Sequence, residues 1–221
     1  LGVRAALGWV FGNDSCKGRT VAIQGTGAVG SALARRLAAA GAMVYGADRN
    51  QQRLQQLHRE IGLVPVSEAE IMTMKCDVFA PCALGAILHD ETIPKLNTPI
   101  IAGAANNLLL EPRHGQALAD RNILYAPDYV INAGGIVNVS VEFHPGGYDE
   151  KVSLAKIERI PQALKELWTI AKEDRIPPSV AADRLAERIL AEARSKKVAV
   201  ASPPGGRGSP RHDDRRRRLP E

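Results

Sequence analysis

A glycine-rich turn between two apolar runs constrains this chain more than any other feature. The turn directly follows the apolar run 20–24 and reads Gly25-Thr26-Gly27-Ala28-Val29-Gly30. A second apolar run, 42–47, ends at the acid Asp48. Strand, glycine turn, helix, strand and acid in this order are the pattern of a dinucleotide-binding unit. The sequence therefore predicts an α/β fold that holds a dinucleotide.

Each glycine of the turn has a separate predicted task. Gly25 permits the tight turn, Gly27 lets the backbone approach a pyrophosphate, and Gly30 leaves room where helix and strand touch. A helix that begins here directs unpaired N–H groups and a partial positive charge toward the phosphates. We therefore expect all six residues of the turn to bind the cofactor.

The acid after the second run bears on which dinucleotide is bound. Asp48 can accept hydrogen bonds from the adenosine ribose, and its charge disfavours a 2′-phosphate. Arg49 weakens this argument, because a guanidinium can partner a phosphate. The favoured interpretation is that Arg49 is a solvated side chain lying along the adenine. NAD is the predicted cofactor, with Asp48 at its ribose.

Apolar runs alternate with helical stretches along much of the chain. Buried strands are predicted at 77–80, 99–102 and 122–125, with helices between them, for example at 111–120. A polar helix capped by Asn50 is expected to end near Ile61. This alternation indicates a Rossmann-type, doubly wound parallel sheet with right-handed crossovers.

The chain becomes helical after Gly135. Pro161 falls inside an apolar stripe and is expected to kink or restart a helix, and a last helix is predicted from Ser179 to about Arg194. The predicted organisation has four parts: a linking helix and turn at 1–19, a dinucleotide-binding domain at 20–150, C-terminal helices at 151–198, and a disordered tail rich in Arg, Pro and Gly at 199–221.

The basic character of the chain comes mainly from this tail. Of the net charge of +5, residues 201–221 supply +3, from six arginines against Asp213, Asp214 and Glu221. The tail has too little apolar content to fold alone. A nucleic-acid-binding tail is an alternative interpretation, but a disordered extension or sequence foreign to the domain is favoured.

The remaining chemistry-bearing residues indicate no second site. The five histidines are scattered, without metal-ligand spacing, so no metal site is expected. Three dispersed cysteines suggest no disulfide framework and favour a reducing, cytoplasmic setting. No apolar stretch is long enough to span a bilayer, so no membrane partner is expected.

Four further segments carry a family resemblance. In chain order they are residues 76–85, 101–107, 125–135 and 180–184, and the third reads Tyr125-Ala126-Pro127-Asp128-Tyr129-Val130-Ile131-Asn132-Ala133-Gly134-Gly135. Behind the glycine turn, these segments resemble the leucine, valine and phenylalanine dehydrogenases of the glutamate dehydrogenase superfamily. The resemblance covers roughly residues 5–195. It implies NAD-dependent, reversible oxidative deamination of a hydrophobic L-amino acid to a 2-oxo acid and ammonia.

The resemblance also implies roles for residues beyond the glycine turn. Asp48 with Arg49 would hold the adenosine ribose. Cys82 and Ala83 would pass beside the cofactor, and Ala104, Ala105 and Asn106 would border the nicotinamide ribose and ring. Asn132 would lie close to nicotinamide and substrate, and Val180 would form one wall of the substrate side-chain pocket. The alternatives are that both asparagines only satisfy turn backbones, that Cys82 only packs, and that Val180 only packs the last helix.

The resemblance further implies that part of the machinery is missing. The family's catalytic lysine and proton-transferring acid lie in an N-terminal domain that would precede Leu1, so no catalytic residue is predicted here. We expect the chain to bind NAD weakly and to turn over no amino acid alone; the full-length protein would be a homo-oligomer. The alternative is a non-catalytic dinucleotide-binding or regulatory module.

Overall fold

The computed structural model describes residues 1–143 and 146–201 of the chain. Its internal contacts divide the chain into two units, Leu1–Leu185 and Ala186–Glu221. The first unit contains the whole sheet and every residue of the predicted site. The predicted divisions near residues 19, 150 and 198 stay predictions.

The first unit is built on a parallel sheet with strand order β3-β2-β1-β4-β5-β6. This order reverses direction between β1 and β4, as in a doubly wound dinucleotide-binding fold, which confirms the predicted fold class. The strands are β1 (Thr20–Gln24), β2 (Met43–Ala47), β3 (Val64–Pro65), β4 (Val78–Pro81), β5 (Ile100–Ile101) and β6 (Leu124–Tyr125).

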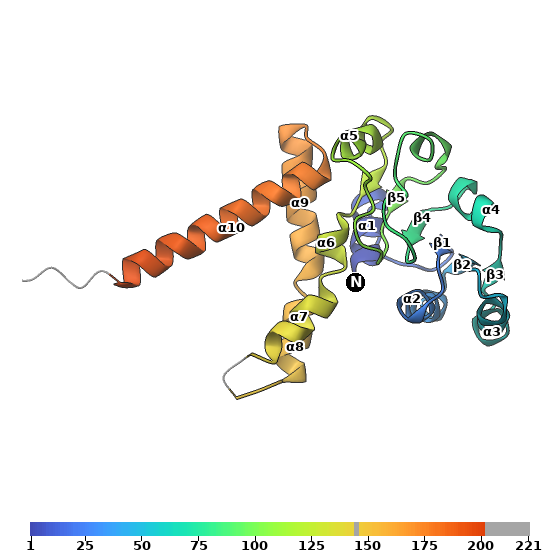
Figure 1. Cartoon of the computed structure of the whole chain (residues 1–221), viewed down its shortest axis with the longest axis horizontal. Coiled ribbons are helices and arrows are strands. Elements are labelled where there is room, and N and C mark those ends of the chain that lie inside the picture. Colours follow the sequence, from blue (N-terminus) through green and yellow to red (C-terminus); the bar gives the residue numbers. More distant parts are fainter. Residues whose placement is uncertain (144–145, 202–221) are drawn as a thin grey trace, which may run out of the picture. The chain divides into compact units, whose positions relative to one another are not determined.

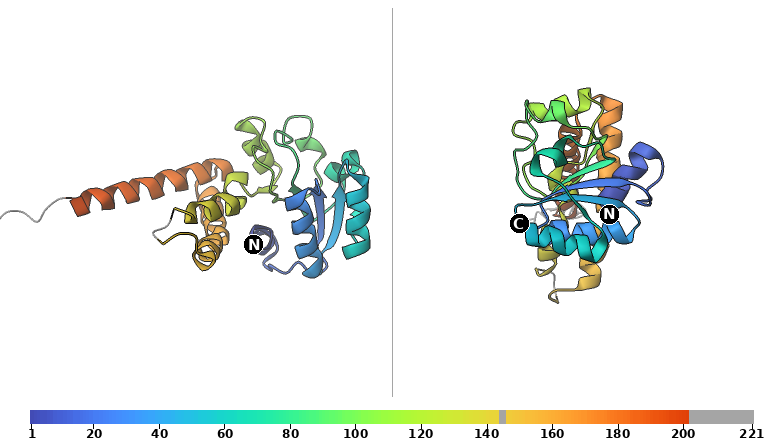
Figure 2. Two further views of the ribbon diagram at one scale, coloured as in Figure 1. Left: turned by 60° about the horizontal axis from the view of Figure 1, so that its bottom comes forward. Right: turned by 90° about the vertical axis from the view of Figure 1, so that its right-hand side faces the viewer.

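Helices cover both faces of the sheet. Figure 1 and the right-hand view of Figure 2 show α2 and α3 on one side of the strands and α5 on the other. The first face packs on α1 (Gly2–Phe11), α2 (Ala28–Ala39), α3 (Gln51–Ile61) and α9 (Ile160–Asp174). The second packs on α4 (Glu68–Thr73), the short 3-10 helix η1 (Ile93–Lys95) and α5 (Arg113–Asp120).

The strands read as continuous apolar runs because both of their faces are buried. Val21 and Ile23 of β1 belong to the core cluster under α2 and α9, whereas Ala22 between them belongs to the cluster under α4 and α5. All three side chains are completely buried. A strand covered on both faces has no position for an alternating polar residue.

Local signals set the ends of the helices that flank the glycine turn. The Asn50 side chain accepts a hydrogen bond from the Arg53 N–H at 3.0 Å and caps α3, as predicted. Gly62 ends α3 in the left-handed conformation, with φ at 70°. The predicted helix from Asn50 to Ile61 is confirmed.

The C-terminal helices differ in detail from the expectation. The chain forms α6 (Asp128–Ile131), α7 (Gly134–Val141) and α8 (Glu150–Ile157) before α9 begins. Pro161 stands in the first turn of α9 and restarts the helix, since a proline there lacks only an N–H that would be unpaired anyway. The last helix, α10 (Pro178–Ala201), continues beyond the predicted end at Arg194. The rest of the predicted tail, 202–221, lies outside the described residues.

A buried tryptophan connects the C-terminal helices to the sheet. Trp168 of α9 is 1% exposed, and its indole N–H donates to the Tyr125 carbonyl in β6 at 3.1 Å. Its ring lies 5.7 Å from the ring of Trp9 in α1, centroid to centroid. One side chain thus joins α1, α9 and the sheet edge that leads into the 125–135 segment.

Candidate functional site

The ends of β1 and β2 bring the glycine turn and the acid together. In the parallel register Gln24 lies opposite Ala47, and the Gly25 N–H donates to the Ala47 carbonyl at 2.8 Å. Asp48 is the next residue along the chain. The two segments that the sequence singled out are therefore neighbours at the carboxyl end of the sheet, beside the point where the strand order reverses.

Asp48 is held by the backbone around it. Its Oδ2 accepts from the Thr26 N–H at 2.7 Å and from the Thr26 hydroxyl at 3.0 Å, and its Oδ1 accepts from the Asn50 N–H at 2.8 Å. Burial alone would raise the pKa of Asp48, but these hydrogen bonds outweigh it and lower the pKa below its usual value. The acid is thus ionised and orients the glycine turn, a role that the sequence pattern did not indicate.

The steric reasons predicted for two of the glycines are present. Gly25 has φ of +89°, and a Cβ there would lie 2.5 Å from the Cβ of Ala83. A Cβ on Gly30 would overlap the carbonyl oxygen of Gly25, where α2 crosses the end of β1. Gly27 differs, because a Cβ there would meet no atom within 4 Å. The space beside Gly27 is open for another molecule.

The first turn of α2 faces this space without a side-chain cap. Gly27 is the N-cap residue and has no side chain to accept from the N–H groups of Ala28 and Val29. The nearby Ser31 hydroxyl does not cap them either, since it donates to the Thr26 carbonyl. A helix N-terminus with uncapped N–H groups and a positive dipole end is suited to bind an anion.

A pocket of about 190 Å³ lies beside the acid. It is lined by Gln24, Gly25, Ala47, Asp48, Arg49, Glu68, Ala83 and Leu84. The Arg49 guanidinium crosses to α4, where its Nε lies 3.3 Å from Oε1 of Glu68. Oε1 of Gln24 is buried without a hydrogen-bond partner. Glu68 belongs to this pocket, although no pattern in the sequence indicated it.

Cys82 lies under the turn as a packing residue. Its N–H donates to the Gln24 carbonyl at 2.7 Å, and its Cβ is close to the position of a Cβ on Gly30. Burial raises the pKa of its thiol to about 11, so the sulfur stays protonated at neutral pH. This favours the interpretation of Cys82 as a small side chain without redox chemistry.

The predicted nicotinamide-side residues come together where the loop after β5 meets Asn132 at the end of α6. Ala104 and Ala105 donate their N–H groups to the Pro81 carbonyl at 2.8 and 2.9 Å. The Asn132 amide donates to the Ala104 carbonyl at 2.7 Å and to Oδ1 of Asn106 at 2.8 Å. Asn132 thus satisfies a turn carbonyl and also positions Asn106, which is exposed.

A buried acid to which the sequence pattern assigned no role fixes this loop. Asp128 is 6% exposed, accepts from the Tyr125 hydroxyl, and accepts from the Asn107 N–H at 2.6 Å. Asn107 has φ of +54°, in the left-handed region that few residues other than glycine and asparagine adopt. The hydrogen bond from its N–H to Asp128 holds the loop in this conformation. The only sequence signal was a single acid inside the apolar 125–131 segment.

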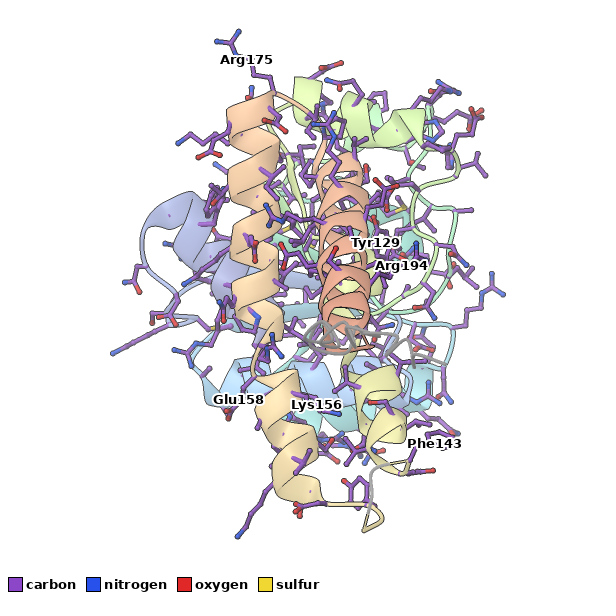
Figure 3. All side chains as sticks on the ribbon, turned by 90° about the vertical axis from the view of Figure 1, so that its left-hand side faces the viewer. Tyr129, Phe143, Lys156, Glu158, Arg175 and Arg194 are labelled. Carbon is purple, nitrogen blue, oxygen red and sulfur yellow. The ribbon has the colours of Figure 1, made fainter. Side chains whose placement is uncertain are left out.

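Val180 is the predicted site residue on the last helix. It is 39% exposed in the first turn of α10. Its neighbours are tied to α6, since the Tyr129 hydroxyl lies 3.0 Å from the Ser179 carbonyl and 2.9 Å from Oδ1 of Asp183. Figure 3 shows Tyr129 beside α10. The substrate role of Val180 stays a prediction.

The described part of the chain offers neither a metal centre nor a membrane span. No group of three or more His, Cys, Asp or Glu side chains among the described residues is placed to hold a metal ion. None of the helices that the structure describes has the length and apolar character needed to cross a membrane.

Comparison with known proteins gives consistent matches. The profile of the family described as glutamate/leucine/phenylalanine/valine dehydrogenase matches residues 45–197. Leucine dehydrogenase of Geobacillus stearothermophilus is 46% identical over 186 residues, which are 84% of this chain and 50% of that protein. Valine dehydrogenase of Streptomyces albus is 43% identical over 199 residues, 89% of this chain and 54% of that protein.

A solved structure agrees with the sequence matches. L-tryptophan dehydrogenase from Nostoc punctiforme superimposes with a TM-score of 0.85 at 40% identity, covering 88% of this chain and 58% of that one. The chain thus spans about half the length of the curated relatives that it matches.

Proposed function

Because this chain belongs to the glutamate/leucine/phenylalanine/valine dehydrogenase family, we propose that it is the NAD-binding part of an L-amino-acid dehydrogenase. The reaction is the reversible oxidative deamination of a hydrophobic L-amino acid to a 2-oxo acid, ammonia and NADH. The substrates are small molecules, and the full-length protein is a homo-oligomer in this proposal. The observation that carries it is the uncapped N-terminus of α2 beside an ionised, pre-oriented Asp48.

The residues present fit a dinucleotide. Gly27 leaves open space in front of the N–H groups of α2, so a pyrophosphate meets donors and no side chain. Asp48 lies on the pocket lining and is ionised, so it can accept hydrogen bonds from a ribose hydroxyl. The side-chain oxygen Oε1 of Gln24, in the same lining, is buried without a hydrogen-bond partner. A donor on the ligand would satisfy it.

The amide cluster supplies orientation at the other end of the cofactor. When bound, NAD accepts a hydride from the substrate carbon. Asn106 and Asn132 are fixed to each other and to the Ala104 carbonyl, so they form a pre-arranged polar patch for a neutral carboxamide. Asn132 and Val180 are the proposed substrate contacts.

The chain by itself is proposed to bind NAD without turnover. None of the residues gathered in the candidate site is a lysine, and the contacts described above include no proton relay. Hydride transfer also needs the substrate carbon held against the cofactor and shielded from water. In this proposal, the lysine and acid that the family resemblance implies come from another part of the full-length protein.

Titration of the 221-residue chain with NADH, followed by nucleotide fluorescence and calorimetry, tests the binding proposal. We expect saturable binding that the variant Gly27→Leu weakens by about tenfold or more, since a side chain there fills the space in front of α2. Gly8→Ala is the matched control, because a Cβ there makes only ordinary contact with Asp14. Unchanged fluorescence at millimolar protein, or equal affinity of Gly27→Leu and wild type, would refute the proposal.

The second half of the proposal is tested by turnover. Leucine, valine or phenylalanine is incubated with NAD and the purified chain, and NADH is followed spectroscopically. We expect none to form. Formation of NADH by the chain alone would show that the lysine and acid are dispensable.

A further inference from the structure

The two arginines beside Asp48, Arg49 and Arg53, each lie within ion-pair distance of a carboxylate. Arg49 and Glu68 line the pocket and face each other, with Nε 3.3 Å from Oε1. Arg53, the other guanidinium next to the acid, lies 3.4 Å from Oδ2 of Asp48. Asp48, Glu68 and Arg49 therefore line this pocket. Arg53 lies beside it and pairs with Asp48.

A 2′-phosphate on the adenosine ribose needs the opposite arrangement. It carries close to two negative charges and is bound by an arginine whose donors are free for it. In the proposed NAD site, Asp48 accepts the ribose hydroxyl, and Arg49 is the arginine of the pocket lining that could partner a phosphate. Glu68 competes for that guanidinium from the first turn of α4.

We propose that Glu68 is a specificity residue that excludes the 2′-phosphorylated dinucleotide, NADP, by occupying Arg49 and adding negative charge to the pocket. This inference rests on the proposed NAD site. It bears on the ambiguity that the sequence leaves at Arg49, because the Nε of this guanidinium pairs with an acid on another helix at 3.3 Å. Asp48 and Glu68 together disfavour the phosphate, and Arg49 is the cation for which Glu68 and a phosphate compete.

The exposure of the pair sets the size of the effect. The Arg49 and Glu68 side chains are 84% and 55% exposed, so their interaction is weakened by water and salt. Removing the Glu68 charge is therefore expected to raise the affinity for NADPH relative to NADH by about three- to tenfold at low salt. The change should shrink in high salt, because exposed charges are screened.

The experiment measures NADH and NADPH affinities of the full chain by fluorescence titration and calorimetry. The variant is Glu68→Gln, which keeps the shape of the side chain and removes its charge. Glu70→Gln is the matched control, since it removes the same charge from the same helix at a residue outside the pocket lining. We expect the NADPH-to-NADH affinity ratio to rise in Glu68→Gln and to stay at the wild-type value in Glu70→Gln.

A double-variant cycle tests the role of Arg49. If Glu68 acts by competing with the 2′-phosphate for Arg49, adding Arg49→Gln to Glu68→Gln abolishes most of the gain in NADPH affinity. A ratio that is unchanged in Glu68→Gln, that rises equally in Glu70→Gln, or that stays raised in the double variant would overturn the inference. Displacement of NADH by adenosine 2′,5′-bisphosphate and by 5′-AMP repeats the comparison for the adenosine half alone.

Failure of the proposed function gives a different result. If the wild-type chain binds neither NADH nor NADPH, the site itself is wrongly assigned and the inference fails with it. If NADH binds and only the ratio fails to respond, the NAD site stands and Glu68 is excluded as its specificity residue.

Discussion

The carboxylate of Asp48 accepts two hydrogen bonds from Thr26, one from its backbone N–H at 2.7 Å and one from its hydroxyl at 3.0 Å. Thr26 is completely buried between the first two glycines of the turn. The acid at the end of β2 thus fixes the loop at the end of β1 before any ligand arrives. Such pre-organisation reduces the ordering cost of binding.

Replacing this acid should loosen the turn and weaken cofactor binding together. Asp48→Asn removes the charge that accepts from Thr26 and Asn50, and we expect a loss of about 1–3 kcal/mol in the free energy of unfolding. Thr26→Val, which removes only the hydroxyl, should cost about 1 kcal/mol. Urea denaturation and NADH titration of the same samples check both. A variant Asp48→Asn as stable as wild type would contradict the assigned role.

The same acid predicts a pH dependence of stability. The pKa of Asp48 is lowered in the folded chain, so the unfolded chain binds the proton more readily. Its stabilising contribution is present above the unfolded pKa of about 3.9 and is lost as the pH falls through the lower folded value. The difference in urea midpoint between wild type and Asp48→Asn should therefore be constant near neutral pH and shrink in acid. A difference that grows in acid would have the wrong sign.

The glycines of the turn should separate folding from binding. At Gly30 an added methyl overlaps the Gly25 carbonyl, so Gly30→Ala is expected to cost about 1–3 kcal/mol of stability and to weaken NADH binding as α2 shifts. At Gly27 an added methyl meets no protein atom, so Gly27→Ala should leave the thermal midpoint near that of wild type. Equal thermal midpoints for the two variants would show that α2 tolerates the clash.

The buried acid Asp128 is expected to matter more than an exposed one. Asp128→Asn weakens the acceptor of the Asn107 N–H and the Tyr125 hydroxyl, and should cost about 1–3 kcal/mol and reduce NADH affinity through the loop that carries Asn106. Asp174→Asn is the control, because its pair with Arg184 is exposed and is worth about 0–1 kcal/mol. Chemical denaturation of both variants makes the comparison, and similar losses would contradict it.

Trp168 should be the most sensitive position in the helical layer. Trp168→Ala empties a fully buried site and is expected to cost about 3–5 kcal/mol. Trp168→Phe keeps much of the packing but leaves the Tyr125 carbonyl without its donor, at about 1–3 kcal/mol. Since the chain has two tryptophans, Trp9→Phe leaves Trp168 as the single tryptophan. Its emission should be that of a buried indole until the chain unfolds. Water-exposed emission in the native state would contradict the packing.

The central part of the fold could be predicted from the sequence because its signals are local. The apolar runs 20–24 and 42–47 contain β1 and β2, Asn50 caps its own helix, and Gly25 takes a positive φ that favours glycine. Each of these depends on residues only a few positions apart. The segments predicted as strands at 99–102 and 122–125 contain β5 and β6. No signal indicated β3, because its two residues form a strand only through their pairing with β2.

The amino-acid sequence by itself determined the glycine turn, the acid that faces it and the alternation that makes the sheet parallel, because steric limits and hydrophobic period act within a single segment. Only the tertiary structure decided that Asp48 accepts hydrogen bonds from Thr26, that Asp128 accepts one from Asn107, and that Glu68 pairs with Arg49. Those partners lie on separate loops and helices. Their contacts exist only once the sheet has set the distances between its ends.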